Sequence, residues 1–321
     1  MKSLISVFLV FAFAKAITAQ VHSSLEHLKL PQITQADNTA KNEVYRIQTA
    51  TYKADSLGYE PVVLQVQNFN EAGLKFQDYQ QIFGKYKSET LDSFYYTGTR
   101  LDSIVKKTSS GGFDATMIFE CDNQGRVTSE KATGKYINYV TQYTYENNQL
   151  QHIEMKLKRG NRRTATYYYK KGNLDYVKQH EYKENGELKK EFTVYYTSGI
   201  PIARVTANDP LITVADFTGV YKIRTQLSQE QAIEALQKAA AISRTDLFNK
   251  RKEITQQEVM LEQYSTSTES STGEWTKRHI TRKMFSKLED RWVFRKLYFP
   301  DSTTVGSTQF DILFQHKIKR Y

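Results

Sequence analysis

The residues best suited to chemistry lie in a basic, tyrosine-rich stretch between residues 156 and 191. The stretch holds eleven Lys or Arg residues against five Asp or Glu residues, an excess of six positive charges. Cations attract anionic polymers and aromatic rings stack on their units, so this alternation is typical of a binding surface. We predict a binding site of eight residues: Lys156, Lys158, Arg159, Arg162, Arg163, Tyr167, Tyr168 and Tyr169.

A structural explanation of the same residues stays open. Lysines on exposed strands block aggregation between sheet edges, and tyrosine rings cover neighbouring strands while the hydroxyl stays in water. A binding role requires rings that core packing leaves uncovered. If the basic patch is a surface feature, Arg162→Glu with Arg163→Glu leaves the fold intact, because surface changes shift stability by about 0.5 kcal/mol or less.

Patterns for catalysis and metal binding are weak. His152 and Glu154 share one strand face but lack a third metal ligand, and Cys121 has no sequence neighbour that would activate a thiol. Two carboxylate pairs, Glu289 with Asp290 and Glu181 with Glu184, are better explained as turn and surface charges than as a glycosidase pair. We therefore expect no catalytic residue, no metal and no cofactor.

An internal repeat between residues 64 and 205 must position the candidate residues. Each unit has an aromatic residue, a short polar turn with Gly or Asn, and an apolar residue that opens the next strand. Gly and Asn supply the positive φ that tight hairpins need. The apolar residues that follow the turns are Leu74, Leu101, Val127, Leu150, Leu174, Leu188 and Ile202.

Two of these units resemble known repeat families. The run Asp122-Asn-Gln-Gly125-Arg126-Val127-Thr128-Ser129, followed by Tyr143-Thr-Tyr145-Glu146, resembles the YD repeat of RHS-type proteins. Tyr182-Lys-Glu-Asn-Gly-Glu-Leu-Lys-Lys190 resembles the variant MORN repeats of bacterial envelope proteins. Both resemblances imply consecutive β-hairpins. Glu146 and Lys170 stand where a YD repeat prefers Asp, and the repeats are too few for an encapsulating shell.

The rest of the chain sets the domain plan. Residues 20–60 form an N-terminal segment, weakly helical over 36–51, and residues 61–210 form the repeat region. Residues 211–321 form a small α+β unit with one helix and about four strands. Its helix begins at the capping box of Ser228 and Gln231, and its last strand is expected over 308–321. The predicted fold is mainly β: an antiparallel β-hairpin repeat in an extended meander sheet, followed by this α+β unit.

Residues 1–19 read as a signal peptide, because Lys2 precedes an apolar run that is too short to span a bilayer. Its removal also removes Lys15 and leaves 43 basic residues against 35 acidic ones. A basic exported chain with one Cys fits a bacterial envelope better than the eukaryotic secretory pathway. We expect the periplasm, the outer-membrane surface or the outside of a Gram-negative bacterium, and no transmembrane segment in the mature chain.

The function predicted from these features is a non-enzymatic binding or scaffold module of the bacterial cell envelope. Its expected partner is an anionic polysaccharide or an envelope protein, and nucleic acid is not expected outside the cell. Two alternatives stay open. One is a carbohydrate-active hydrolase, and the other is an immunity or toxin-neutralising protein.

Overall fold

A computed structural model describes residues 44–55, 58–84, 87–109, 111–158, 160–269, 275–284 and 287–317. The predicted signal peptide and residues 20–43 lie outside these ranges. The chain divides into two compact units. Among the described residues, we call Gln142–Tyr264 with Lys283–Lys287 the central unit, and Val44–Thr141 with Ser265–Arg282 and the residues from Leu288 onward the flanking unit. The predicted domain bounds at 61 and 210 stay predictions.

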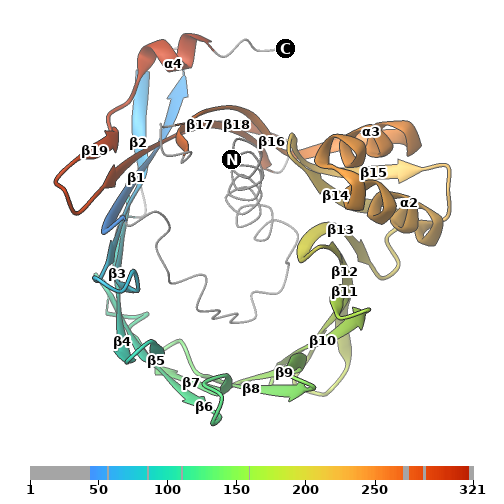
Figure 1. Ribbon diagram of the computed structural model, residues 1–321, viewed down its shortest axis with the longest axis horizontal. Helices are drawn as coiled ribbons and strands as arrows, with labels where there is room; N and C mark the ends of the chain where they lie inside the picture. Colours follow the sequence, from blue (N-terminus) through green and yellow to red (C-terminus); the bar gives the residue numbers. More distant parts are fainter. Residues whose placement is uncertain are drawn as a thin grey trace, which may run out of the picture. The chain divides into compact units, whose positions relative to one another are not determined.

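The fold is mainly β, as predicted, and consecutive strands pair in antiparallel hairpins (Figure 1). The flanking unit contains β1 (Arg46–Asp55), β2 (Gly58–Phe69), β3 (Lys75–Ile82), β4 (Ser88–Thr97), β5 (Arg100–Thr108), β6 (Ala115–Cys121), β7 (Val127–Gly134), β19 (Thr304–Gly306) and α4 (Ile312–Lys317). The central unit contains β9 (Gln149–Leu157), β10 (Arg162–Lys170), β11 (Asn173–Tyr182), β12 (Leu188–Thr197), β13 (Ile200–Thr206), β14 (Ile212–Asp216), β15 (Gly219–Thr225), α2 (Gln229–Ile242) and α3 (Arg244–Ile254). Four strands contain residues of both units: β8 (Tyr139–Glu146), β16 (Thr255–Glu269), β17 (Trp275–Met284) and β18 (Lys287–Tyr298).

Strand β1 pairs on both sides within the flanking unit. Its residues 46–53 pair with β18, from Arg46 opposite Tyr298 to Lys53 opposite Arg291, and its other edge pairs with β2. The weak helix predicted over residues 36–51 is therefore wrong for residues 46–51. Pairing on both edges satisfies the backbone of this segment, and Thr49, Thr51 and Tyr52 favour strands.

All seven turns predicted from the repeat join consecutive strands, and each contains a residue with positive φ. Three of them have positive φ at both central residues, as type I′ turns require: Asn147-Asn148, Lys171-Gly172 and Ser198-Gly199. A β-bulge lies at the aromatic residue that the repeat places before the turn in five hairpins. These residues are Phe69, Tyr96, Tyr169, Tyr182 and Tyr196.

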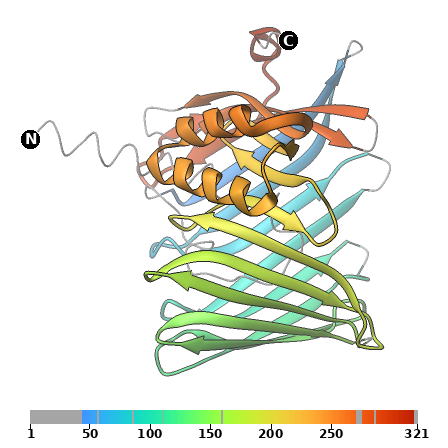
Figure 2. The ribbon, with the colours of Figure 1, turned by 90° about the vertical axis from the view of Figure 1, so that its right-hand side faces the viewer.

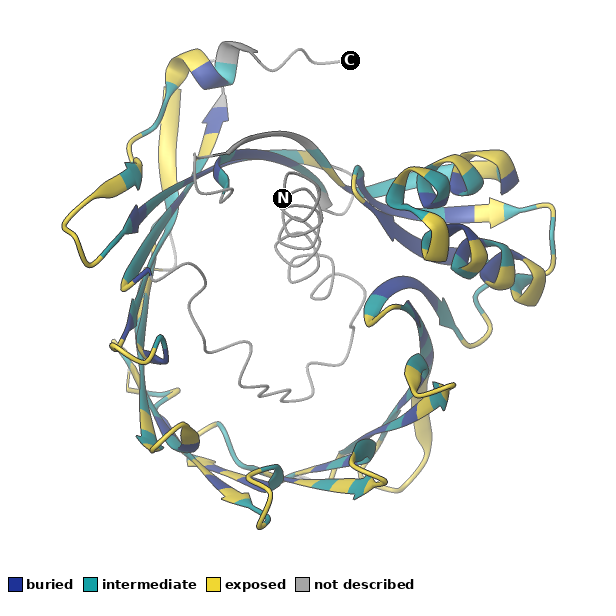
Figure 3. Cartoon of the chain, viewed as in Figure 1, coloured by how far each residue is buried: buried dark blue, intermediate teal, exposed yellow. Residues whose placement is uncertain are grey.

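Burial alternates along the strands, as period-two side-chain placement requires (Figure 3). In β9, for example, Ile153 and Met155 are buried whereas Lys156 is exposed. The low apolar content of the chain follows from strands that bury mainly one face.

Two helices cover one face of β12, β13 and β14 (Figure 2). Ile233 and Leu236 of α2 and Leu247 of α3 pack on Ile202 and Val214 in one apolar cluster. The predicted capping box is present: the Ser228 hydroxyl accepts from the Gln231 backbone, and the Gln231 side chain accepts from the Ser228 backbone.

The prediction of one helix and about four strands after residue 210 is wrong in three respects. Six strands of the described ranges, β14 to β19, follow this residue, and two of them, β14 and β15, precede the helices. Ser243 has an extended φ of −160° and caps both α2 and α3, so the single expected helix is two helices. The strand expected over 308–321 is replaced over Ile312–Lys317 by α4. There the carboxylate of Asp311 accepts hydrogen bonds from the backbone N–H groups of Leu313 and Phe314, which starts a helix.

No helix in the described ranges combines the length and the hydropathy that are needed to cross a bilayer.

Candidate binding surface

The predicted basic and aromatic residues occupy both faces of strands β9 and β10. Arg162 lies opposite Lys156 of β9, and Arg163 lies opposite Glu181 of β11. Alternation places Arg162 and Tyr168 on one face of β10, and Arg163 and Tyr167 on the other. The eight predicted residues therefore do not form one surface. Lys158 lies just after β9, and Arg159 lies outside the described residues.

Of the three consecutive tyrosines, only Tyr168 is exposed. Tyr167 is 6% exposed and Tyr168 is 37% exposed. Tyr169 is half-buried, and its hydroxyl donates a hydrogen bond to the Leu150 carbonyl at 2.9 Å. Burial raises the pKa of Tyr169. Tyr167 and Tyr169 therefore have structural roles, and Tyr168 alone keeps a ring available for a ligand.

Tyr168 begins a row of three rings that crosses β10, β11 and β12. Its ring stacks on Tyr176 with the centroids 4.4 Å apart and the planes 18° apart. Tyr176 in turn contacts Tyr195, with centroids 5.8 Å apart. Tyr195 packs against the apolar cluster beneath α2. We call Tyr168, Tyr176 and Tyr195 the tyrosine row; one end is anchored in the core and the other is exposed.

Burial is the main cause of a raised pKa at Tyr195, with smaller contributions from Tyr176, Glu230 and Asp175. Asp175 also accepts a hydrogen bond from the Gln237 amide of α2 at 2.9 Å, and the same amide donates to the Tyr196 carbonyl at 3.1 Å. These contacts fix α2 beside the tyrosine row. The anchored end of the row therefore lies beside α2 and close to acidic groups.

The cations on the same face as Tyr168 are partly balanced by acids. Arg162 stacks over the Tyr182 ring at 4.3 Å and lies 3.4 Å from the Glu154 carboxylate, which also pairs with Lys156. Lys170 lies near Glu234 of α2. The hydrogen bond from Lys238 is the main cause of the lowered pKa of Glu234, and the charge of Lys170 adds to it. Lys178 lies two residues from Tyr176, on the same face. Arg162, Lys170 and Lys178 therefore supply the positive charges on this face.

Arg163 belongs to a separate cluster on the opposite face. It lies 3.7 Å from Glu181, which also accepts a hydrogen bond from Lys189 at 3.1 Å. Burial raises the pKa of Glu181, but the bond from Lys189 and the charge of Arg163 outweigh it, so this pKa lies below its ordinary value. The side chain of Glu181 is only 13% exposed. Arg163 is therefore a structural partner of Glu181, and its role in ligand binding stays a prediction.

Three of the carboxylates considered for hydrolysis, Glu289, Asp290 and Glu181, have partners of their own. Glu289 pairs with Arg291, whereas Asp290 lies 3.2 Å from His279 and accepts a hydrogen bond from Thr281. Glu181 is held by Lys189 and Arg163 as described above.

The metal and thiol candidates are also in structural settings. His152 is hydrogen-bonded to Thr166 at 3.1 Å. Within the described ranges, no three His, Cys, Asp or Glu side chains converge as metal ligands would. Burial raises the pKa of the Cys121 thiol, which opposes formation of a thiolate.

No protein-family profile matches the chain, and no curated protein sequence matches it. One solved structure with weak similarity is a chain of the TcdB2-TccC3-TEV crystal structure, at a TM-score of 0.24 and 10% identity. The alignment covers 86% of this chain and 19% of that chain, so the protein spans about a fifth of the length of that chain. The resemblance to YD and MORN repeats stays an expectation from the sequence.

Sequence reasoning missed Tyr176, Tyr195 and Gln237. Tyr176 becomes a neighbour of Tyr168 only through the register of the β10–β11 hairpin, including the bulge at Tyr168 and Tyr169. The Lys171-Gly172 turn is a signal that could have placed the two rings near each other, because a two-residue hairpin loop fixes the register of its strands. Nothing local indicated Gln237, which comes from a helix 61 residues after Tyr176.

Proposed function

We propose that this chain is an exported, non-enzymatic binding module of a bacterial envelope, and that it binds an anionic polysaccharide on the tyrosine row. The supporting observation is the position of Tyr168. It is 37% exposed and stacked on Tyr176, although the other two rings of the Tyr167–Tyr169 run are occupied. An aromatic ring held by a second ring loses little conformational freedom when a ligand packs on it.

Charge supports an anionic ligand. Arg162, Lys170 and Lys178 share the face of the tyrosine row, and the whole chain has 45 basic residues against 35 acidic ones. Cations near the rings raise the local concentration of a polyanion. Because this attraction acts through solvent, added salt weakens it, whereas the packing of sugar rings on Tyr168 persists. Binding is expected to have both a salt-dependent and a salt-resistant part.

The carboxylate of Glu154, next to Arg162 and Lys156, favours a polysaccharide over nucleic acid as the ligand. Glu154 lies 3.4 Å from each of these cations, so a ligand with a phosphate on every unit would meet this carboxylate. The sugars of a polyuronate carry carboxylates and also have neutral C–H faces that pack on aromatic rings. The proposed ligand class is therefore a uronic-acid-containing polysaccharide.

The test compares retention of the purified protein on immobilised polygalacturonate, dextran sulfate and neutral dextran at several salt concentrations. We expect retention on polygalacturonate that falls, but does not vanish, as sodium chloride rises, and weaker retention on dextran. The protein could instead bind dextran sulfate only at low salt and show no retention on polygalacturonate. That result would show ion exchange alone and would overturn the proposal.

A further inference from the structure

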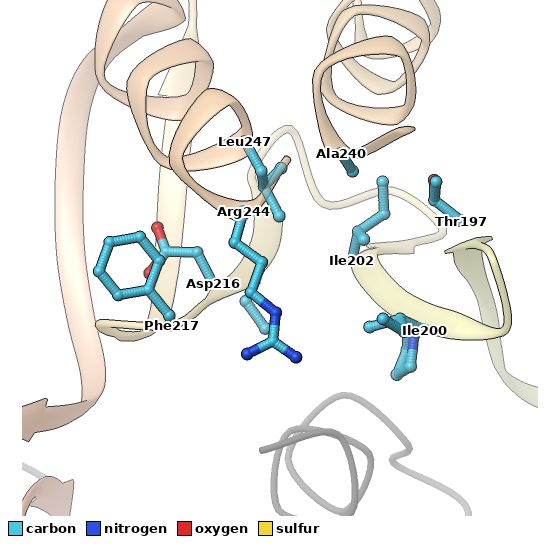
Figure 4. Close-up of a pocket in the computed structure, with 10 residues that line it drawn as sticks. Thr197, Ile200, Ile202, Asp216, Phe217, Ala240, Arg244 and Leu247 are labelled. Atoms are coloured by element: carbon cyan, nitrogen blue, oxygen red, sulfur yellow. The ribbon is translucent and has the colours of Figure 1, made fainter. Parts of the chain in front are cut away.

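A pocket lies between β13, the β14–β15 turn and helices α2 and α3 (Figure 4), and none of its lining residues belongs to the tyrosine row. Its enclosed space is small, about 60 Å³, and reaches about 480 Å³ only when the open mouth is counted. The walls are mostly apolar side chains, among them Ile200 and Ile202 of β13, Ala240 of α2 and Leu247 of α3. Mainly apolar walls with a few polar groups are typical of small-molecule sites.

One acid and one base line the pocket, and the acid is already neutralised. Asp216 Oδ2 accepts a hydrogen bond from Arg251 Nε at 2.7 Å, and Oδ1 accepts from the backbone and the hydroxyl of Thr218 at 2.8 and 2.6 Å. The Arg251 side chain is 0% exposed and also pairs with Glu258. Asp216 therefore belongs to a closed ion-pair network and has no charge left for a second base.

The base is Arg244, the first residue of α3. Within the described part of the chain it forms no ion pair and no side-chain hydrogen bond, yet burial is sufficient to lower the pKa of its guanidinium. Figure 4 shows the guanidinium pointing away from the Asp216 carboxylate. A half-buried cation without an acid is costly, and an anion placed beside it would remove that cost.

We propose that this pocket binds a small amphipathic carboxylate, such as a medium-chain fatty acid. The alkyl chain would lie between Ile202, Ala240 and Leu247, and the carboxylate would accept two hydrogen bonds from the planar guanidinium of Arg244. The apolar walls exclude small polar anions, because acetate or phosphate would gain the Arg244 contact without covering the walls. The site is independent of the polysaccharide proposal and uses none of its residues.

The test measures binding of octanoate to the full chain by isothermal titration calorimetry, with octan-1-ol and acetate as comparison ligands. We expect measurable binding of octanoate, weaker binding of octan-1-ol and none of acetate. Arg244→Gln should weaken octanoate binding about tenfold or more, equivalent to about 1.4 kcal/mol, and leave octan-1-ol unchanged. The matched control is Arg224→Gln, which removes an exposed arginine of β15 in the same unit and should have no effect.

Ala240→Leu should fill the pocket and weaken both octanoate and octan-1-ol. Thermal melting followed by circular dichroism checks that each variant folds, and the Arg244→Gln comparison decides the question if Ala240→Leu does not fold. The proposal is overturned if wild type does not bind octanoate, if octanoate and octan-1-ol bind equally, or if Arg244→Gln and Arg224→Gln behave alike.

Discussion

The hydroxyl of Tyr96 donates a hydrogen bond to the backbone carbonyl of Lys75, with the two atoms 2.8 Å apart. Tyr169 makes the matching bond to the Leu150 carbonyl at 2.9 Å. In both hairpins the tyrosine lies at the β-bulge before the turn, and its partner lies at the beginning of the preceding strand. The aromatic position of the repeat is therefore a link between neighbouring hairpins as well as a packing residue.

We expect Tyr96→Phe to lower the free energy of unfolding by about 1 kcal/mol, because it removes one intramolecular hydrogen bond while keeping the ring. The matched control is Tyr95→Phe on the same strand, because Tyr95 is 54% exposed. Urea unfolding measures both. Equal stability of the two variants would show that the link contributes nothing.

High pH should destabilise the protein through the same residue. Burial raises the pKa of Tyr96 to about 12, whereas an exposed tyrosine in the unfolded chain has a pKa of about 10. Between these values the unfolded state loses the proton and the folded state keeps it, so stability falls as pH rises from about 10 to about 12. Tyr96→Phe should show a smaller loss over this window in urea unfolding at stepped pH. A decline parallel to that of wild type would contradict the assignment.

Arg163→Glu is expected to destabilise the fold, contrary to the sequence-based expectation that the basic patch tolerates acidic substitutions. The new carboxylate would face Glu181, whose side chain is 13% exposed and loses one of its cations. The two carboxylates would repel each other, and Glu181 would keep only the hydrogen bond from Lys189, so we expect a loss of about 1–3 kcal/mol. Lys131→Glu, at an exposed position, is the control. If both variants melt at the wild-type temperature, Arg163 has no structural role.

Gly172→Val should destabilise the β10–β11 hairpin by backbone strain alone. Gly172 has a φ of +80°, and an added Cβ would meet no atom within 4 Å. Left-handed backbone costs an ordinary residue about 1–2 kcal/mol, whereas Asn tolerates it well. Gly172→Asn is therefore the control and should lose less than half as much stability in urea unfolding. Equal losses for Val and Asn would point to a cause other than φ.

The parts of this fold that depend on local chemistry could be predicted from the sequence. Asn147-Asn148 and Lys171-Gly172 mark turns because few residues tolerate positive φ, and Ser228 with Gln231 marks a helix start. The division between α2 and α3 was missed, because Ser243 is a single polar residue within a helical pattern and its extended φ is visible only in the structure.

The candidate site was predicted in part, because its contacts depend on register. The sequence indicated Tyr168 but gave it the same role as Tyr167 and Tyr169. Side-chain direction and the bulge at Tyr168 and Tyr169 separate the three residues. The pairing of Arg163 with Glu181 joins two strands across a turn, and the apolar pocket at Arg244 joins strands and helices, so neither has a local sequence signal.

The most direct test of the proposed function is the dissociation constant for soluble polygalacturonate of wild type, Tyr168→Ala and Tyr95→Ala, measured at fixed salt. Tyr168 and Tyr95 are both exposed tyrosines on strands, but only Tyr168 is part of the tyrosine row. We predict that Tyr168→Ala weakens binding about tenfold, equivalent to about 1.4 kcal/mol, while Tyr95→Ala stays within about twofold of wild type. Equal affinities for the two variants would contradict the account.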